Sequence, residues 1–262
     1  METVGVVIPS YKEQDNIGPL IRRIRELLPD ARIIVVDDSP DEATIQAVDR
    51  EKAGLARPDL VEAVHRGSKG GRGSAVLDGM RRLLDAGCDR VIEMDADFSH
   101  SPDEIPGHLA AARERGLDLL IASRYIPGSR IENWPLKRLL FSRMANLLTR
   151  TLLRIPVTDY TTGFRFYSRR AVEEVCRTCG RLGRGFIALS ETLVQLDLAG
   201  CRMGEARTVF VNRARGESSV TREELCAGEV PAGPVHNQAR RDALRRARPR
   251  RRRGPHGHDI RA

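Results

Sequence analysis

Three acidic side chains occupy alternate positions in the stretch RVIEMDADFSHSP, namely Glu93, Asp95 and Asp97. In an extended segment, residues two apart point to the same side, so Asp95 and Asp97 can share one site. Carboxylates this close repel each other unless a cation lies between them, and oxygen ligands suit Mg²⁺ or Mn²⁺, which commonly bridge to substrate phosphates. A solvated strand end that turns into a helix at Pro102 explains the pattern equally well. The residues alone leave both interpretations open.

The elements around this stretch predict a mainly parallel sheet. Short apolar runs indicate strands over residues 4–9, 33–38, 60–65, 90–95 and 117–123. Apolar residues at helical spacing fill the segments between them, which indicates right-handed strand–helix–strand crossovers. Asp37 and Asp38 end the second strand, and the Asp95–Asp97 pair ends the fourth. Because ligands bind outside the carboxyl ends of such strands, we expect these acidic residues at the ligand-binding edge.

Two common nucleotide-binding loops do not occur in the sequence. A dinucleotide fingerprint, G-x-G-x-x-G, would follow the first strand, where PSYKEQ stands instead. The Walker A pattern, G-x-x-x-x-G-K-[ST], is also absent. The glycine-rich stretch GSKGGRGSA over residues 67–75 precedes a helical segment, so its amides could cradle a phosphate. An ordinary flexible loop is the other interpretation, and the residues by themselves favour it.

The composition is that of a globular protein with a basic end. The chain has 262 residues, of which 40% are hydrophobic and 31% charged. Residues 240–262 contain ten Arg and two Asp, which account for the whole net charge of +8. Because Pro, Gly and Arg replace periodic apolar residues after Thr221, we expect a domain over residues 1–220 and a basic, disordered tail over residues 221–262. Such a tail would attract nucleic-acid phosphates without sequence preference, so a nucleic-acid-associated protein is the alternative function class.

Cysteine usage and the absence of long apolar runs indicate a cytoplasmic protein. Five scattered Cys residues are typical of reduced thiols, and no apolar run reaches 18 residues. The first residues enter a strand-like run without the basic segment of a signal peptide. Cys176 and Cys179 form a C-x-x-C pair, but no second pair has the spacing of a zinc ribbon.

Residues 134–155 combine an apolar stripe with positive charge. Apolar residues recur at helical spacing from Leu136 to Ile155. The basic residues among them are Lys137, Arg138, Arg143, Arg150 and Arg154. A basic amphipathic helix can lie on an anionic membrane surface. A helix that packs on the sheet with its Arg residues in solvent is the other interpretation, and the favoured one for much of the stripe.

Seven stretches in order resemble the family 2 glycosyltransferases, specifically those that transfer mannose to dolichyl or polyprenyl phosphate. They are VVIPSYKEQDNI, IIVVDDSPD, HRGSKGGRGSAVLDG, EMDADFSHSPDEIP, ASRYIPGSRIENWP, VTDYTTGFRFYS and RARGES. They run from Val6 to Ser218, about four fifths of the chain. The resemblance implies a GT-A fold, a Rossmann-like α/β single domain with a mainly parallel central sheet and helices on both faces. It also implies a sugar nucleotide and a Mg²⁺ or Mn²⁺ ion at the D-x-D motif.

The resemblance assigns roles to individual residues. Nucleotide-sugar binding is implied for Pro9, Tyr11, Glu13, Asp37, Asp38, Lys69, Arg72, Asp95, Ala96 and Asp97. The metal ligands would be Asp95 and Asp97, with Ser99 as a further candidate. Acceptor-phosphate binding is implied for Arg124, Arg213 and Arg215, and the catalytic set would be Asp95, Asp97, Arg124 and Arg215. Glu191 lies in a helix that faces the active site in relatives.

The implied reaction moves mannose from GDP-mannose to dolichyl or polyprenyl phosphate with inversion at the sugar. An anionic phosphate acceptor needs no strong base; the reaction needs positioning, Arg charge at the incoming phosphate and a metal at the departing diphosphate. The implied location is the cytoplasmic face of a membrane, reached peripherally through residues 134–155 or through a separate anchoring subunit or domain. No specific nucleic acid is expected. Transfer of glucose or N-acetylglucosamine from a UDP-sugar is the alternative among enzymes.

The chain departs from the family pattern in three places. DDSPD is one residue shorter than the usual DDxSPD, which affects the ribose side of the site. Ser219 stands where relatives often have a phosphate-binding Lys. The residues after Val220 look unlike a family C-terminus.

Overall fold

The computed structural model describes residues 2–68, 70–180 and 187–212. All of them belong to the first of two compact units, Met1–Val230, and the second unit, Pro231–Ala262, lies outside them. The expected boundary at residue 220 and the predicted site residues Lys69, Arg213 and Arg215 also lie outside the described residues.

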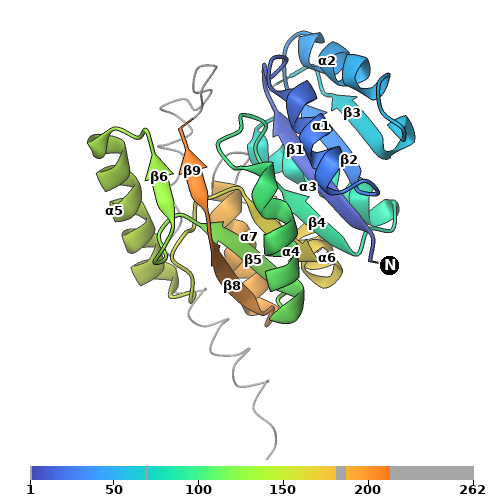
Figure 1. Ribbon diagram of the computed structural model, residues 1–262. Helices are drawn as coiled ribbons and strands as arrows, with labels where there is room; N and C mark the ends of the chain where they lie inside the picture. Colours follow the sequence, from blue (N-terminus) through green and yellow to red (C-terminus); the bar gives the residue numbers. More distant parts are fainter. Residues whose placement is uncertain (1, 69, 181–186, 213–262) are drawn as a thin grey trace, which may run out of the picture. The chain divides into compact units, whose positions relative to one another are not determined.

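Strands and helices alternate through the first half of this unit, as the apolar runs predict (Figure 1). They are β1 (Val4–Ser10), α1 (Ile17–Leu27), β2 (Arg32–Asp37), α2 (Ala43–Lys52), β3 (Val61–His65), α3 (Arg72–Asp85), β4 (Arg90–Glu93), α4 (Ile105–Glu114) and β5 (Leu119–Ser123). The second half adds β6 (Arg130–Glu132), α5 (Leu136–Leu153), β7 (Arg165–Ser168), α6 (Arg169–Thr178), α7 (Ile187–Leu198), β8 (Met203–Arg207) and β9 (Val209–Val211). Short 3₁₀ turns, Pro58–Leu60 and Pro102–Glu104, precede β3 and α4.

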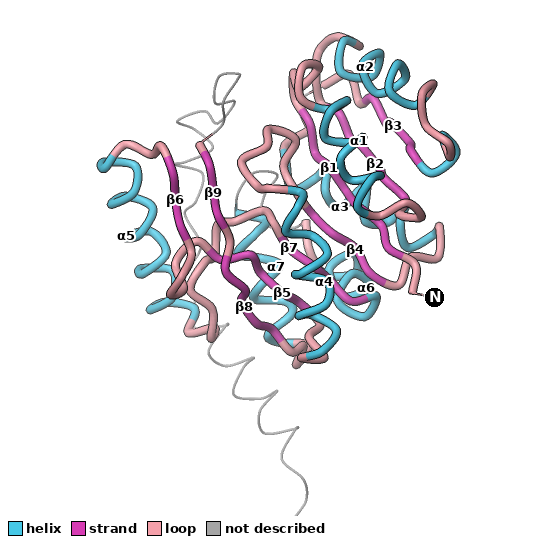
Figure 2. The backbone as a smooth tube through the Cα atoms, viewed as in Figure 1, coloured by secondary structure: helices cyan, strands magenta, loops and turns pink. Residues whose placement is uncertain are grey.

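The central sheet has seven strands in the order β3-β2-β1-β4-β7-β5-β8. Neighbouring strands are parallel except at β7, which runs antiparallel to both β4 and β5. Glu93 of β4 lies opposite Arg165 of β7. The residues just before β7 therefore lie beside the carboxyl end of β4. In Figure 2, β6 and β9 form a second, two-stranded parallel sheet beside α5.

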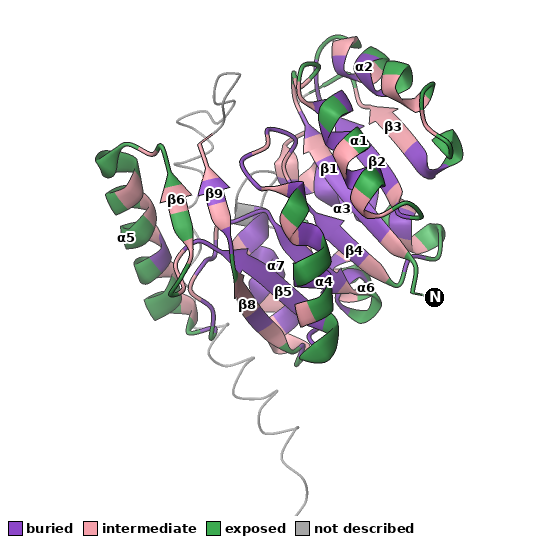
Figure 3. Ribbon diagram, in the orientation of Figure 1, coloured by how far each residue is buried: buried purple, intermediate pink, exposed green. Residues whose placement is uncertain are grey.

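Helices cover both faces of the central sheet, because strand residues alternate between two apolar clusters. Val6 and Ile8 of β1 belong to a cluster shared with α1 and α4, whereas Val7 belongs to a cluster shared with α3, α6 and α7. Figure 3 shows the inner strands β1, β2, β4 and β5 as mostly buried, with exposed residues on the outer sides of the helices. The α/β fold class, with its mainly parallel sheet and helices on both faces, is confirmed.

Helix α5 differs from the other helices because its apolar side chains face solvent. The exposed large hydrophobic residues of the described chain all lie on it: Leu136, Leu140, Phe141, Met144, Leu147, Leu148 and Leu152. Each is at least 56% exposed, and Asn146 is the buried residue of the helix. The favoured sequence interpretation, a stripe packed on the sheet, is therefore wrong for most of this helix. Within the described residues, no helix combines the length and apolarity needed to cross a membrane.

Candidate active site

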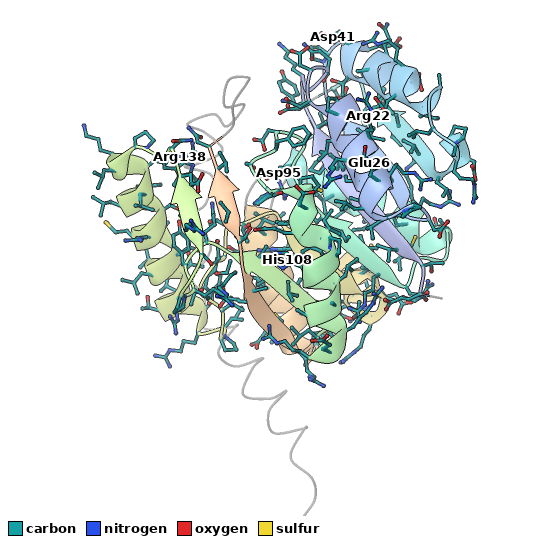
Figure 4. The ribbon with its side chains drawn as sticks, in the orientation of Figure 1. Arg22, Glu26, Asp41, Asp95, His108 and Arg138 are labelled. Atoms are coloured by element: carbon teal, nitrogen blue, oxygen red, sulfur yellow. The ribbon has the colours of Figure 1, made fainter. Side chains whose placement is uncertain are left out.

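The acidic residues meet at the carboxyl edge of the sheet. Strands β1, β2 and β4 are parallel neighbours, with Ser10 opposite Asp37 and Val7 opposite Glu93. Asp95 and Asp97 follow β4 in a loop rather than within the strand, because β4 ends at Glu93. Figure 4 shows the Asp95 side chain beyond the end of β4.

Arg72, the first residue of α3, binds two carboxylates, one in this loop and one at the end of β4. Its Nε donates to Asp95 Oδ1 at 2.9 Å, and its Nη1 donates to Glu93 Oε1 at 2.6 Å. Burial lowers the pKa of Arg72, but the charges of Asp95 and Glu93 outweigh burial and raise it overall. Tyr167 donates its hydroxyl to the other oxygen of Glu93 at 2.7 Å. Glu93, to which the sequence assigned no role, therefore positions Arg72 from inside the core, where it is 1% exposed.

Gly163 makes room for the Arg72 guanidinium. A Cβ atom at this position would lie 1.9 Å from Arg72 Nη2 and 3.3 Å from Asp95 Oδ1. No side chain fits there without moving Arg72. The antiparallel β7 brings this glycine, from the motif VTDYTTGFRFYS, beside the D-x-D motif.

Asp97 is held by a local turn. Its Oδ1 accepts a hydrogen bond from the backbone amide of Ser99 at 3.0 Å, and Phe98 between them has φ of 57°. His100 follows in the same loop at 1% exposure, and its Nδ1 is buried without a hydrogen-bond partner. Burial lowers the pKa of His100, while the carboxylates of Asp95 and Asp97 act in the opposite direction. The imidazole therefore lies within the electrostatic reach of both predicted metal ligands.

The donor set at this edge fits a hard divalent cation completed by its substrate. Within the described part of the chain, no group of three or more His, Cys, Asp or Glu side chains is arranged to hold a metal. Asp95 and Asp97 would supply two carboxylates, and Ser99, 3% exposed, follows in the same turn. Mg²⁺ is usually bound in this way, by one or two carboxylates with waters and substrate phosphates.

Asp38 has a partner set that the sequence did not predict. Its carboxylate accepts two bonds from Arg66, at 2.5 and 2.7 Å, and one from each amide of Gly70 and Gly71, both at 2.9 Å. Asp38 therefore fixes the glycine-rich loop at the start of α3. Its contact with the nucleotide stays a prediction.

Asp37 is fully buried at the end of β2. Its side chain is 0% exposed and accepts the hydroxyls of Ser10 and Ser39, each at 2.8 Å. His65 Nδ1 lies 3.5 Å from its other oxygen. Asp37 thus links the ends of β1, β2 and β3. Its contact with the nucleotide stays a prediction.

The remaining nucleotide candidates divide between the surface and the core. Pro9, Tyr11 and Glu13 lie half-buried at the end of β1, with Lys12 between the last two in the left-handed region at φ 57°. Glu13 accepts a hydrogen bond from Asn16 at 2.7 Å. These three residues remain predicted ligand contacts. Ala96 is 3% exposed and packs in the core cluster, so its methyl group supports the loop from inside.

Arg124, which follows β5, is held in a buried ion pair that the sequence did not predict. Its Nε and Nη2 each donate to Asp159 at 2.8 Å, and Nη2 also donates to Thr161 at 2.6 Å. Burial opposes both charges, but the pairing outweighs it, so the pKa of Arg124 is raised and that of Asp159 lowered. The guanidinium carbon also lies 5.3 Å from the ring centre of Phe210 and 5.5 Å from that of Trp134. These contacts give Arg124 a single orientation.

Asp159 is the functional candidate that the sequence analysis missed. It is 0% exposed and also accepts the backbone amides of Thr161 and Thr162, each at 3.1 Å. Its position in the family motif VTDYTTG could have indicated it, although it lies 35 residues from Arg124 in the sequence. Glu191 lies buried in α7, where it accepts the amide of Gly180 at 3.0 Å.

Comparison with known proteins identifies the family. Residues 5–176 match the model of the glycosyl transferase family 2, which is more than half of the chain. The chain belongs to this family. The resemblance that its motifs indicated is therefore confirmed.

Two curated relatives carry more specific names. The polyprenol monophosphomannose synthase of Mycolicibacterium smegmatis is 41% identical over 170 residues, covering 65% of this chain and 63% of that protein. The undecaprenyl-phosphate mannosyltransferase of Micrococcus luteus is 33% identical over 220 residues, covering 83% of this chain and 87% of that one. This family 2 chain thus spans less than two thirds of the first relative and most of the second.

Solved structures show the same fold at lower identity. A structure described only as a mycobacterial protein superposes with a TM-score of 0.59 at 21% identity, covering 93% of this chain and 73% of that one. The glucosyl-3-phosphoglycerate synthase of Mycobacterium tuberculosis, in complex with Mn²⁺, UDP and glucosyl-3-phosphoglycerate, also gives 0.59, at 18% identity and with coverages of 93% and 78%.

Proposed function

We propose that this chain transfers mannose from GDP-mannose to the phosphate of a polyprenol or dolichol, with GDP as the second product. The observation that carries the proposal is the 41% identity to a polyprenol monophosphomannose synthase over the segment that holds the D-x-D loop. The second relative is also named as a mannosyltransferase acting on a polyprenyl phosphate. The tuberculosis synthase has this fold with UDP, so a UDP-sugar is the alternative donor.

The donor side of the proposed site uses the carboxylates after β4. Asp95 and Asp97 would hold a Mg²⁺ or Mn²⁺ ion, which when bound stabilises the negative charge of the departing diphosphate. Arg72 orients Asp95 through its 2.9 Å hydrogen bond, and Glu93 orients Arg72. Asp38 and Asp37 hold the glycine-rich loop and the strand ends in place around the nucleotide.

The acceptor side relies on arginine. An oxygen of the lipid phosphate would attack C1 of mannose as the bond from C1 to GDP breaks, so one displacement inverts the sugar. Arg124 would orient the incoming phosphate, assisted by Arg213 and Arg215. Asp159 fixes Arg124 before the substrate arrives, and a preorganised donor needs no reorganisation in the transition state.

The exposed apolar side of α5 supports a peripheral position on the cytoplasmic face of a membrane. Phe141, Met144 and Leu148 are each more than 60% exposed, and the sequence of α5 contains no Asp or Glu. Burial of such side chains at the headgroup boundary is favourable, and basic residues add attraction to anionic lipids. A separate anchoring subunit is the alternative way to hold the enzyme at the acceptor.

Incubation of the purified chain with GDP-mannose, a short-chain polyprenyl phosphate and Mn²⁺ or Mg²⁺ tests the proposal. We expect a mannosylated lipid by mass spectrometry, and its loss in EDTA. UDP-glucose and UDP-N-acetylglucosamine in parallel reactions test the donor. Transfer from a UDP-sugar alone would overturn the GDP-mannose assignment, and absence of any transfer or nucleotide-sugar binding by the folded protein would overturn the enzyme.

A further inference from the structure

A pocket of about 500 Å³ opens between the loop after β5 and one side of α5. The loop contributes residues 124–129, and Thr158 also lines the pocket. Helix α5 contributes Arg143, Asn146, Leu147 and Arg150, which recur at helical spacing. Leu147 is also one of the exposed apolar residues of α5, so the pocket is continuous with that exposed side.

The charge of this pocket is positive and comes from α5. Among the residues that the structure describes, no Asp or Glu lines it. Arg124 lines it too, but Asp159 compensates its charge through two bonds of 2.8 Å. Arg143 and Arg150, both exposed, make no ion pair within the described residues. The carboxylate of Glu205 accepts the hydroxyl of Thr158 at 2.6 Å, but Glu205 does not itself line the pocket.

We infer that this pocket binds the phosphate of an anionic phospholipid headgroup. Two uncompensated guanidiniums facing one cavity suit a phosphate, because each offers several donors in a fixed plane. The side chain of Asn146 is committed to Ser142 and to Thr161, so Arg143 and Arg150 would supply the main contacts. The position beside exposed leucines favours a phosphate that arrives with acyl chains over a free one.

This lipid site adjoins the phosphate position proposed for the acceptor, because Arg124 lines the pocket, and it differs from that position in its main contacts, Arg143 and Arg150. The hydroxyl of Tyr125 donates to Ser142 at 2.6 Å, which links the loop to α5 on the N-terminal side of Arg143. Arg124 is buried and lines the same pocket as α5, so a lipid held there would lie next to the acceptor arginine. The inference rests on the proposed function for its membrane setting and adds the class of lipid that α5 recognises.

Calorimetry with dihexanoyl phosphatidylglycerol below its micelle concentration tests the pocket without a membrane surface. The test variant is Arg143→Gln with Arg150→Gln. The matched control is Lys137→Gln with Arg154→Gln, which removes the same charge from two exposed positions at the ends of the same segment that do not line the pocket. We expect the test variant to lose at least tenfold in affinity and the control to stay within twofold of the wild type. Thermal unfolding of all three proteins checks that they fold equally.

Three results would overturn the inference: no binding by the wild type, equal losses in both variants, or inorganic phosphate binding as tightly as the lipid. The last result would assign the pocket to free phosphate. Mannosyl transfer to a water-soluble, short-chain acceptor is measured separately. If the wild type binds the lipid but transfers no mannose, the proposed reaction is refuted. If the wild type transfers mannose but does not bind the lipid, only the lipid site is refuted.

Discussion

The carboxyl edge of the sheet and helix α5 differ in how their charged and apolar side chains are arranged. At the sheet edge, Glu93, Asp38 and Arg72 are largely buried, and each has at least two hydrogen-bond partners. On α5, seven large apolar side chains are exposed. There, Arg143 and Arg150 have no ion-pair partner within the described part of the chain.

This difference matches two kinds of ligand. A nucleotide diphosphate is small and must be held in one geometry, so its site benefits from charges whose directions are already set by buried partners. A membrane is large and deformable, so it needs exposed apolar area and mobile positive charge rather than a fixed arrangement. The four predictions below test this division, from the largest expected effect to the smallest.

Asp97→Asn should remove most of the transfer activity. One of the two proposed metal-binding carboxylates becomes neutral, and we expect kcat/KM to fall by about 10³-fold or more, since a lost electrostatic contact of this kind costs roughly 10²–10³ by itself. Steady-state assays at saturating Mn²⁺ measure the effect. Asp103→Asn is the control, because Asp103 pairs with Arg23 at the surface. Activity within tenfold of the wild type would contradict the assignment of Asp97.

Asp159→Asn should destabilise the fold, because it leaves the buried Arg124 without its counter-charge. Breaking a buried pair costs about 3–5 kcal/mol, whereas the exposed pair removed by Glu173→Gln should cost less than about 1 kcal/mol. Urea unfolding at pH 7 gives both free energies of unfolding.

The effect of Asp159→Asn on stability should also depend on pH. The pKa of Asp159 is lowered in the folded state. Its ionised carboxylate therefore contributes fully to the free energy of unfolding above the ordinary pKa of 3.8, and this contribution is lost as pH falls below 3.8 toward the folded pKa. The stability difference between the wild type and Asp159→Asn should therefore shrink below pH 3.8. A stability difference that stays constant with pH would show that it does not come from the ion pair of Asp159 with Arg124.

Leu140→Gln with Met144→Gln should weaken membrane binding without weakening the fold. Both side chains are more than half exposed, so the free energy of unfolding should change by less than about 0.5 kcal/mol. Loss of two insertable apolar side chains should reduce partitioning into anionic vesicles by about 10- to 100-fold. Flotation assays measure the second quantity. A large loss of stability with unchanged flotation would instead identify this side of α5 as part of a packed interface.

Glu93→Gln should impair catalysis without touching substrate. It weakens the hold on Arg72, which orients Asp95, and second contacts of this kind typically change metal affinity or activity by about 10- to 100-fold. Mn²⁺ titration in the presence of GDP gives a readout besides turnover. Tyr167→Phe removes one hydrogen bond to the same carboxylate and should cost about 1 kcal/mol in stability with a smaller loss of activity. Equal effects of the two variants on Mn²⁺ affinity would count against a positioning role for Glu93.

The sequence by itself determined the alternating strands and helices of the first half and the edge at which the acidic residues lie. Continuous apolar runs report burial on both faces, and parallel strands must end at one edge. The sequence alone therefore places the D-x-D loop at the end of β4, although the strand stops at Glu93.

Tertiary structure alone decided which charges meet. Arg124 and Asp159 are 35 residues apart, and Asp38 lies 28 residues from Arg66. The antiparallel β7 between β4 and β5 sets Gly163 against Arg72. Local periodicity cannot encode such pairings, because they depend on the order of strands in the sheet. An apolar stripe likewise shows that α5 has an apolar side, but only the packing of the other elements shows that they leave it uncovered.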